Sequence, residues 1–212
     1  ATNKESLVDD LILVAVPQEG TPQAIGALLH GFGQGVPSQA PLLASPRVMR
    51  ELGRNMPGAY GLLPSTAYFK SVTDPVISFA SASVLPWLEF SRTRYGMGIA
   101  TSSDLHFFLK GIEGRPLPTL VDLTSPSILN PYLLSYTKDL HESIDPWRPA
   151  DDLRVTQIAG WGKDTVKGFR YYAGLKKGRP VLQYVPLFTE DGDQTVVVPS
   201  ALAMATVTPN IS

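Results

Sequence analysis

The feature that most constrains the fold is an unbroken apolar run near the start, from Leu11 to Val16, flanked by Asp10 and Pro17. A run of aliphatic and β-branched residues without polar alternation predicts a strand that is buried on both faces, as in the middle of a parallel sheet. Pro17 cannot donate to a strand ladder, so the strand is expected to end at Val16. A chain that opens almost at once on such a strand is expected to lack the beginning of its fold.

Helical and extended patterns follow this strand. Proline and glycine punctuation and apolar spacing predict helices over 22–30, 47–56 and, near the end, 199–205, together with a returning strand over 154–159. Two further strands, 168–173 and 180–187, flank the polar turn of Lys176, Lys177 and Gly178, which is typical of a β-hairpin. A mixture of helices and a partly parallel sheet predicts the α/β class.

The middle of the chain reads differently. Residues 60–149 are rich in proline, serine and aromatic residues, with short helical patterns over 104–110 and 130–141 and an uncertain strand over 120–122. This composition predicts an irregular inserted subdomain. We therefore expect three segments: a first core segment over 1–46, an inserted subdomain over 47–150, which the resemblance described below makes a cap or lid, and returning core strands with a hairpin over 151–212.

Composition excludes several classes of function. Lysine and arginine number 18 and aspartate and glutamate 19, so the charge predicts no binding to nucleic acid. The absence of cysteine excludes disulfides, thiolate metal sites and a cysteine nucleophile. No apolar stretch approaches the roughly 18 residues of a spanning helix, and glycine pairs such as Gly160 and Gly162 do not complete a nucleotide-binding motif. We expect no transmembrane segment, no metal and no cofactor, and the compartment stays open.

Four short segments, in this order, give the strongest functional signal. They are the loop 17–22 after the first strand, a segment 52–64 with arginine, proline, tyrosine and a Leu-Leu-Pro end, the stretch from His141 through 158–165, and the loop 191–196 followed by Ser200 and Ala201. Together they resemble the lecithin:cholesterol acyltransferase-like lipases of the α/β-hydrolase fold. The resemblance extends over nearly the whole chain and implies a partial hydrolase sheet with an inserted cap.

That resemblance implies a role for one residue above all. In its fourth segment Asp193 corresponds to the catalytic acid, with Asp191 as the nearest rival, while Gly192 allows a tight backbone and Thr195 bonds the loop. A triad carboxylate orients the histidine and stabilises the imidazolium that forms when the serine gives up its proton. The resemblance implies a serine-dependent lipase, esterase or O-acyltransferase acting on lipid-like esters.

The other two triad members are absent from the expected places. The fold carries its serine in a G-x-S-x-G pentapeptide before the acid and its histidine after it. No such pentapeptide occurs here, and His30, His106 and His141 all precede Asp193. The rest of a hydrolase domain would have to supply serine and histidine, so we expect the chain alone to be inactive.

Alternatives remain at each of these positions. Asp191 and Asp193 are also what an ordinary solvated turn contains, whereas a calcium loop is disfavoured because no glutamate closes it. The apolar residues Trp87, Leu88 and Phe90 could line an acyl pocket or a lid with peripheral lipid contact, or could simply form the core of the cap. The whole chain could also be a non-catalytic binding or interaction module with a degenerate hydrolase fold.

Overall fold

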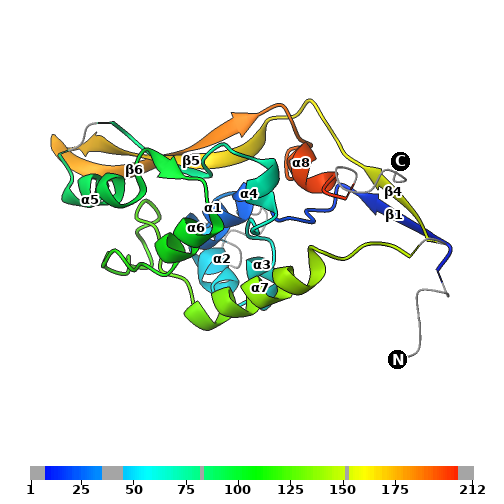
Figure 1. Ribbon diagram of the computed structural model, residues 1–212. Helices are drawn as coiled ribbons and strands as arrows, with labels where there is room; N and C mark the ends of the chain where they lie inside the picture. Colours follow the sequence, from blue (N-terminus) through cyan, green and yellow to red (C-terminus); the bar gives the residue numbers. More distant parts are fainter. Residues whose placement is uncertain (1–7, 35–44, 82–83, 151–152, 205–212) are drawn as a thin grey trace.

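The computed structural model describes residues 8–34, 45–81, 84–150 and 153–204. Within them the chain is mixed α/β, with two sheets and eight helices (Figure 1). The smaller sheet pairs β1 (Asp10–Val14) with β4 (Arg154–Ile158), and the larger one has the order β3-β2-β5-β6. Its strands are β2 (Ile77–Phe79), β3 (Gly98–Ile99), β5 (Thr165–Lys176) and β6 (Arg179–Thr189). The predicted α/β class is confirmed at this level.

The smaller sheet is parallel and in register from Asp10 opposite Arg154 to Val14 opposite Ile158. Among the described residues β1 has β4 as its one partner strand, so its second edge is open. Ile12 and Val14 are 63% and 61% exposed. The prediction that this strand is buried on both faces is therefore wrong, because β1 pairs with β4 alone among the described residues and every second side chain along it is exposed.

A long antiparallel ribbon, β5 with β6, runs along one side of the molecule (Figure 1). Lys177 and Gly178 join the two strands with φ values of 51° and 74°. Two successive positive φ values match the primed turns that suit the twist of a hairpin. The predicted hairpin is confirmed and is longer than predicted. β2 pairs in parallel with β5, so this sheet unites residues on both sides of position 150, while the three-segment division itself stays a prediction.

Most of the eight helices in the described residues begin at a proline in the first turn, where the missing N–H costs no hydrogen bond. α1 keeps its predicted bounds because Gly31 ends it in the left-handed conformation at φ 68°. No helix in the described ranges is long and apolar enough to span a bilayer. Predicted residue 205 of the last helix lies outside the described residues. The helices are α1 (Pro22–His30), α2 (Pro46–Gly53), α3 (Pro57–Tyr60), α4 (Tyr68–Ser71), α5 (Pro86–Tyr95), α6 (Ser102–Leu109), α7 (Pro131–Ile144) and α8 (Val198–Ala201).

The uncertain strand over 120–122 is a turn instead. The guanidinium of the buried Arg50 donates to the carbonyl oxygens of Thr119, Leu120 and Asp122, at 3.1, 3.4 and 2.6 Å. The Asp122 carboxylate in turn accepts from the backbone N–H of Thr124 at 2.9 Å. The Thr119 carbonyl also accepts the Asp122 N–H at 3.0 Å, which closes a turn, so the prediction of a strand is wrong here.

The core lies between the ribbon and the helices packed against it. Phe79, Phe108 and Tyr171 are fully buried and their rings are mutual neighbours, with centroids 6.0 to 6.2 Å apart. α1 approaches β5 so closely that a β-carbon on Gly26 would lie 2.1 Å from the Phe169 ring. This packing fixes the ribbon, and with it the loop that follows β6.

Candidate functional site

Asp193 lies in the loop between β6 and α8, at the carboxyl end of the parallel sheet. Its backbone pairs with Lys163, just beyond the end of β4, and the Lys163 N–H donates to the Gly192 carbonyl at 3.1 Å. A β-carbon on Gly160 would lie 2.6 Å from the Asp193 Cβ. Glycine at position 160 therefore leaves the space that the aspartate occupies. Ligands and catalytic groups in open α/β sheets gather at this edge.

The Asp193 carboxylate is held by one of its two oxygens. Oδ1 accepts the backbone N–H groups of Thr195 and Val196 at 2.9 and 2.8 Å, whereas Oδ2 has no hydrogen-bond partner within the described residues. Asp191 is exposed and its carboxylate makes no hydrogen bond in the described part of the chain. Two backbone donors fix the orientation of the carboxylate and leave Oδ2 open to an outside donor.

Thr165, the first residue of β5, forms hydrogen bonds that stabilise the loop of Asp193. Its fully buried hydroxyl accepts from the Gln194 N–H and donates to the Lys163 carbonyl, both at 2.8 Å. A β-carbon on Gly192 would lie 2.4 Å from that hydroxyl oxygen. Gly192 is therefore required by close approach to Thr165, which the sequence did not indicate, and Thr195 contributes its backbone to the loop.

Hydrogen bonds join the loop after β1 to the loop of Asp193. The buried Ser200 hydroxyl donates to the Gly20 carbonyl at 2.7 Å and accepts the Glu19 N–H at 3.2 Å. The Thr21 hydroxyl donates to the Thr195 carbonyl at 2.8 Å. The first and fourth segments of the sequence signal thus form one unit, which we call the loop junction: residues 18–21 and 195–201.

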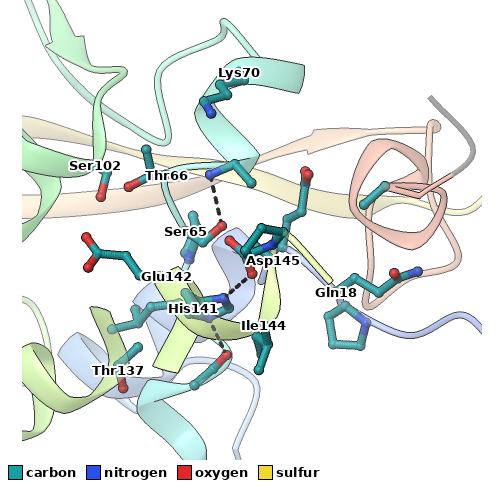
Figure 2. A pocket seen from close by; sticks show the side chains of 18 of the residues that line it. Gln18, Ser65, Thr66, Lys70, Ser102, Thr137, His141, Glu142, Ile144 and Asp145 are labelled. Atoms are coloured by element: carbon teal, nitrogen blue, oxygen red, sulfur yellow. Dashed lines mark hydrogen bonds and ion pairs between the residues drawn. The ribbon is translucent and has the colours of Figure 1, made fainter. Parts of the chain in front are cut away.

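A cleft of about 750 Å³ opens beside the loop junction (Figure 2). Its walls come from residues 16–19, the segment 61–71, Ser102 and His106 of α6, the face of α7 with the residues that follow it, and positions 203–204. Asp193 is not among the residues that line it. Gln18 and Glu19 belong both to the cleft wall and to the loop junction, whereas the Asp193 carboxylate lies outside the cleft lining.

His141 lines the cleft and carries hydrogen bonds on both ring nitrogens. Nδ1 pairs with the Asp145 carboxylate at 2.8 Å and Nε2 with the Gly61 carbonyl at 3.0 Å (Figure 2). Both partners are acceptors, so both nitrogens carry a proton and the ring is an imidazolium. Burial lowers the pKa of His141, but the Asp145 carboxylate outweighs it and the pKa is raised overall.

This arrangement places a serine, a histidine and an aspartate in one cleft without making them a triad. A catalytic histidine needs a free Nε2 to take the proton of the serine. Nε2 of His141 is occupied by Gly61, and the Ser65 hydroxyl accepts the N–H groups of Ala67 and Tyr68 at 3.1 and 3.4 Å. His141 ties α7 to the segment 61–71, as a structural cation.

Glu19 is the other notable group in the wall of the cleft. It is 9% exposed, and its Oε2 is buried without a hydrogen-bond partner among the described residues. Burial raises the pKa of its carboxyl group, as does Asp145, and the opposing effects of Ser71, Lys70 and Arg148 do not cancel the rise. The raised pKa favours the protonated carboxyl group, whose free oxygen can form a hydrogen bond to a polar group in the cleft.

Neither of the other two histidines reaches Asp193. His30 is buried in the core, where Nε2 contacts the Tyr171 hydroxyl at 2.7 Å and Nδ1 the Leu123 carbonyl at 2.9 Å. Burial lowers the pKa of His30 to about 3, so the ring is neutral. His106 lines the cleft, and burial followed by the charge of Lys110 lowers its pKa. In the described chain the acid has no histidine partner.

The three predicted substrate-binding residues are separated by the structure. Leu88 is fully buried in the core, Phe90 is 49% exposed on α5, and Trp87 lines a second pocket at the far end of the ribbon. Their role in substrate binding stays a prediction. Sequence reasoning missed the cleft and the His141–Asp145 pair, although histidine and aspartate four residues apart on a helix are a recognisable signal.

In the residues that the structure describes, no three histidine, aspartate or glutamate side chains are grouped as they would be to hold a metal ion.

Comparisons with known proteins bear on the fold. No family model matches the chain, and the search of curated proteins gave no match. One chain in the crystal structure of the Tle4–Tli4 complex is similar, with a TM-score of 0.54 and 15% sequence identity. The alignment covers 95% of this chain and 46% of that one, so the chain spans about half the length of its structural neighbour. At this identity, the chain shares its α/β fold with part of that protein.

Proposed function

We propose that the chain is the acid-bearing part of a serine-dependent lipase, esterase or O-acyltransferase of the α/β-hydrolase class, similar to the lecithin:cholesterol acyltransferase-like lipases. The observation that carries the proposal is the Asp193 carboxylate. It lies past the carboxyl end of β4, with Oδ1 held by two backbone N–H groups and Oδ2 open. An ordinary solvated turn would not require the glycine contact at position 160 that makes room for it.

The chemistry assigned to Asp193 is that of an orienting carboxylate. A serine hydroxyl attacks the ester carbonyl, and a histidine takes the hydroxyl proton and returns it to the leaving alcohol. Oδ2 of Asp193 accepts the other N–H of that histidine and stabilises the imidazolium. Water or an acceptor alcohol then takes the acyl group from the serine. Serine and histidine come from residues outside the described chain.

The cleft beside the loop junction is the substrate site in this proposal. Its wall combines apolar side chains, including Leu63, Ile144 and Met204, with the polar groups of Glu19 and Lys70. Amphiphilic esters need both kinds of surface, since the acyl chain avoids water while the head group retains its hydrogen bonds. In this proposal the ester binds beside the loop junction, because Gln18 and Glu19 belong both to the junction and to the cleft wall.

The open edge of β1 supports the expectation that further strands complete the sheet. β1 exposes Ile12 and Val14 and lacks a second partner among the described residues, and the chain spans about half of its structural neighbour. A parallel strand with the nucleophile elbow at its end would fit beside β1.

The test is made on the complete reading frame that contains these residues. We expect a G-x-S-x-G within about 50 residues upstream and a histidine downstream. In that complete protein, Asp193→Asn should lower hydrolysis of p-nitrophenyl esters about 10⁴-fold, as loss of the orienting acid does in serine proteases. Asp191→Asn is the matched control and should retain most activity.

Two results would overturn the proposal. If intact flanking sequence lacks both the pentapeptide and the histidine, the chain is a non-catalytic module. If Asp191→Asn abolishes activity while Asp193→Asn does not, the acid is misassigned. Labelling with a fluorophosphonate separates loss of the acid from loss of folding, because the folded Asp193→Asn protein retains its serine and reacts slowly, whereas an unfolded one does not react.

A further inference from the structure

A second pocket, of about 740 Å³, lies at the turn end of the β5–β6 ribbon, opposite the end that leads to Asp193. Three parts of the chain form it: the start of α5, the segment 115–126, and the turn end of the ribbon from Lys176 to Gln183. Most of its wall is apolar, with Leu85, Pro116, Leu123, Val181 and Leu182 among the lining side chains. It is separate from the cleft and from the loop junction.

Two buried nitrogen donors in the wall of this pocket have no acceptor. Trp87 Nε1 and Arg115 Nε are both buried without a hydrogen-bond partner among the described residues. Arg115 is 6% exposed, and its guanidinium lies over the Phe108 ring at 4.4 Å, while the Trp87 ring packs on the same Phe108 at 6.2 Å. Both residues line the pocket and contact the same ring, and an unmet buried N–H is costly.

Of the charged side chains around the pocket, some are already paired and others are open to a ligand. Lys176, at the ribbon end, forms no ion pair within the described residues. Arg115 pairs with Glu113 through Nη1 and donates to the Ser127 carbonyl through Nη2, which leaves Nε unused. Asp122 is the one acidic residue lining the pocket, and its Oδ1 already accepts the N–H groups of Thr124 and Ser125 and the Thr124 hydroxyl.

We propose that this pocket binds a single-chain fatty acid, with the acyl chain along the apolar wall and the carboxylate facing Lys176 and the donors of Trp87 and Arg115. The unpaired donors favour a ligand that carries acceptor atoms, and the apolar wall favours a hydrocarbon chain. A carboxylate supplies two acceptor oxygens and a negative charge that can pair with the Lys176 ammonium group. The site does not depend on the hydrolase proposal, because nothing in it requires serine, histidine or Asp193.

Binding is measured on the chain itself with Trp87 as the reporter. Trp147→Phe with Trp161→Phe leaves Trp87 as the one tryptophan, since the sequence has three. Three ligands share a twelve-carbon chain and are titrated as monomers: dodecanoate, dodecanol and dodecyltrimethylammonium. We expect saturable changes of Trp87 fluorescence in the order dodecanoate, then dodecanol, with the cationic amphiphile weakest.

Matched variants test the head-group contact. Lys176→Gln should weaken dodecanoate about threefold to fivefold at low salt and leave dodecanol unchanged, as for an exposed ion pair. Lys177→Gln, on the adjacent turn residue outside the pocket wall, should leave both unchanged. Trp87→Phe, followed by calorimetry, should weaken dodecanoate about fivefold through loss of the N–H donor.

Three outcomes would overturn the proposal. They are the absence of any saturable response of Trp87, equal affinity for dodecanoate and dodecanol, and equal effects of Lys176→Gln and Lys177→Gln. None of these measurements depends on ester hydrolysis. They therefore distinguish a chain that binds dodecanoate without being part of a hydrolase from a hydrolase part that does not bind dodecanoate.

Discussion

Gly160 packs so closely against Asp193 that a β-carbon on the glycine would lie 2.6 Å from the Cβ of the aspartate. Gly160→Ala should therefore displace the loop and lower the free energy of unfolding by about 1–3 kcal/mol. Gly58→Ala is the control, because a β-carbon on Gly58 meets nothing within 4 Å and the position is helical. Urea unfolding followed by circular dichroism measures both. Equal stability of the two variants would contradict the contact.

The loop junction depends on the Ser200 hydroxyl. Ser200→Ala removes the bond to the Gly20 carbonyl at 2.7 Å and leaves that buried acceptor without its partner. We expect a loss of about 1–3 kcal/mol in the free energy of unfolding. Ser143→Ala, which removes an exposed hydroxyl bonded to the Leu140 carbonyl, should change it by less than about 0.5 kcal/mol. A similar effect of both substitutions would show that the junction adds nothing to stability.

The neutral His30 predicts a loss of stability in acid. Its pKa is about 3 in the folded chain and about 6.5 when unfolded, so below pH 6.5 the unfolded state binds the proton first. The stabilisation is fully present above pH 6.5 and is lost as pH falls toward 3, by about 1.4 kcal/mol per pH unit. In His30→Asn this component of the slope should vanish. Unfolding curves between pH 4 and 7 compare the slopes of the two proteins, and identical slopes would refute a neutral His30.

The His141–Asp145 pair predicts the opposite dependence. The pKa of His141 is raised on folding, so its stabilisation is complete below about pH 6.5 and is lost as pH rises through the folded-state pKa. Asp145→Asn should therefore destabilise most at low pH, by about 3 kcal/mol for a buried pair. Glu142→Gln, in an exposed pair with Lys138, should have little effect. Titration of the His141 ring by NMR shows directly whether the pKa falls in Asp145→Asn.

The open edge of β1 predicts association of the isolated chain. Exposed Ile12 and Val14 beside unpaired backbone groups form a surface on which another strand can pair. The double variant Ile12→Lys with Val14→Lys should shift the chain toward monomer without loss of stability. Sedimentation velocity over a range of concentrations makes the comparison. A parent chain that is monomeric and melts sharply would count against the idea that β1 is normally central.

Elements whose signals are local were predictable from the sequence. α1 has its predicted bounds because Pro22 and Gly31 act within one turn of each end, and the hairpin follows from Lys177 and Gly178. β2 and β3 were not predicted, since strands of three and two residues exist through their pairing with distant β5 and with each other. The residues 120–122 were misread because the decisive partner, Arg50, lies seventy residues away.

The candidate site divides in the same way. Asp193 could be singled out from the order of four short segments, but the reason that Gly160 and Gly192 are glycine lies in their contacts with Asp193 and Thr165 across the fold. The cleft could not be predicted, because residues 16–19, 61–71 and α7 meet only after folding. The proton on both nitrogens of His141 likewise follows from Gly61, eighty residues earlier.

The two backbone donors on Oδ1 of Asp193 have a thermodynamic consequence for any assembly that uses this carboxylate. Thr195 and Val196 belong to the same turn as the aspartate, so its rotamer is selected when the loop folds. The conformational entropy of the Asp193 side chain is therefore lost when this chain folds, before any partner binds. A histidine arriving from elsewhere meets an acceptor whose direction is already set, and the free energy of docking need not include ordering the acid.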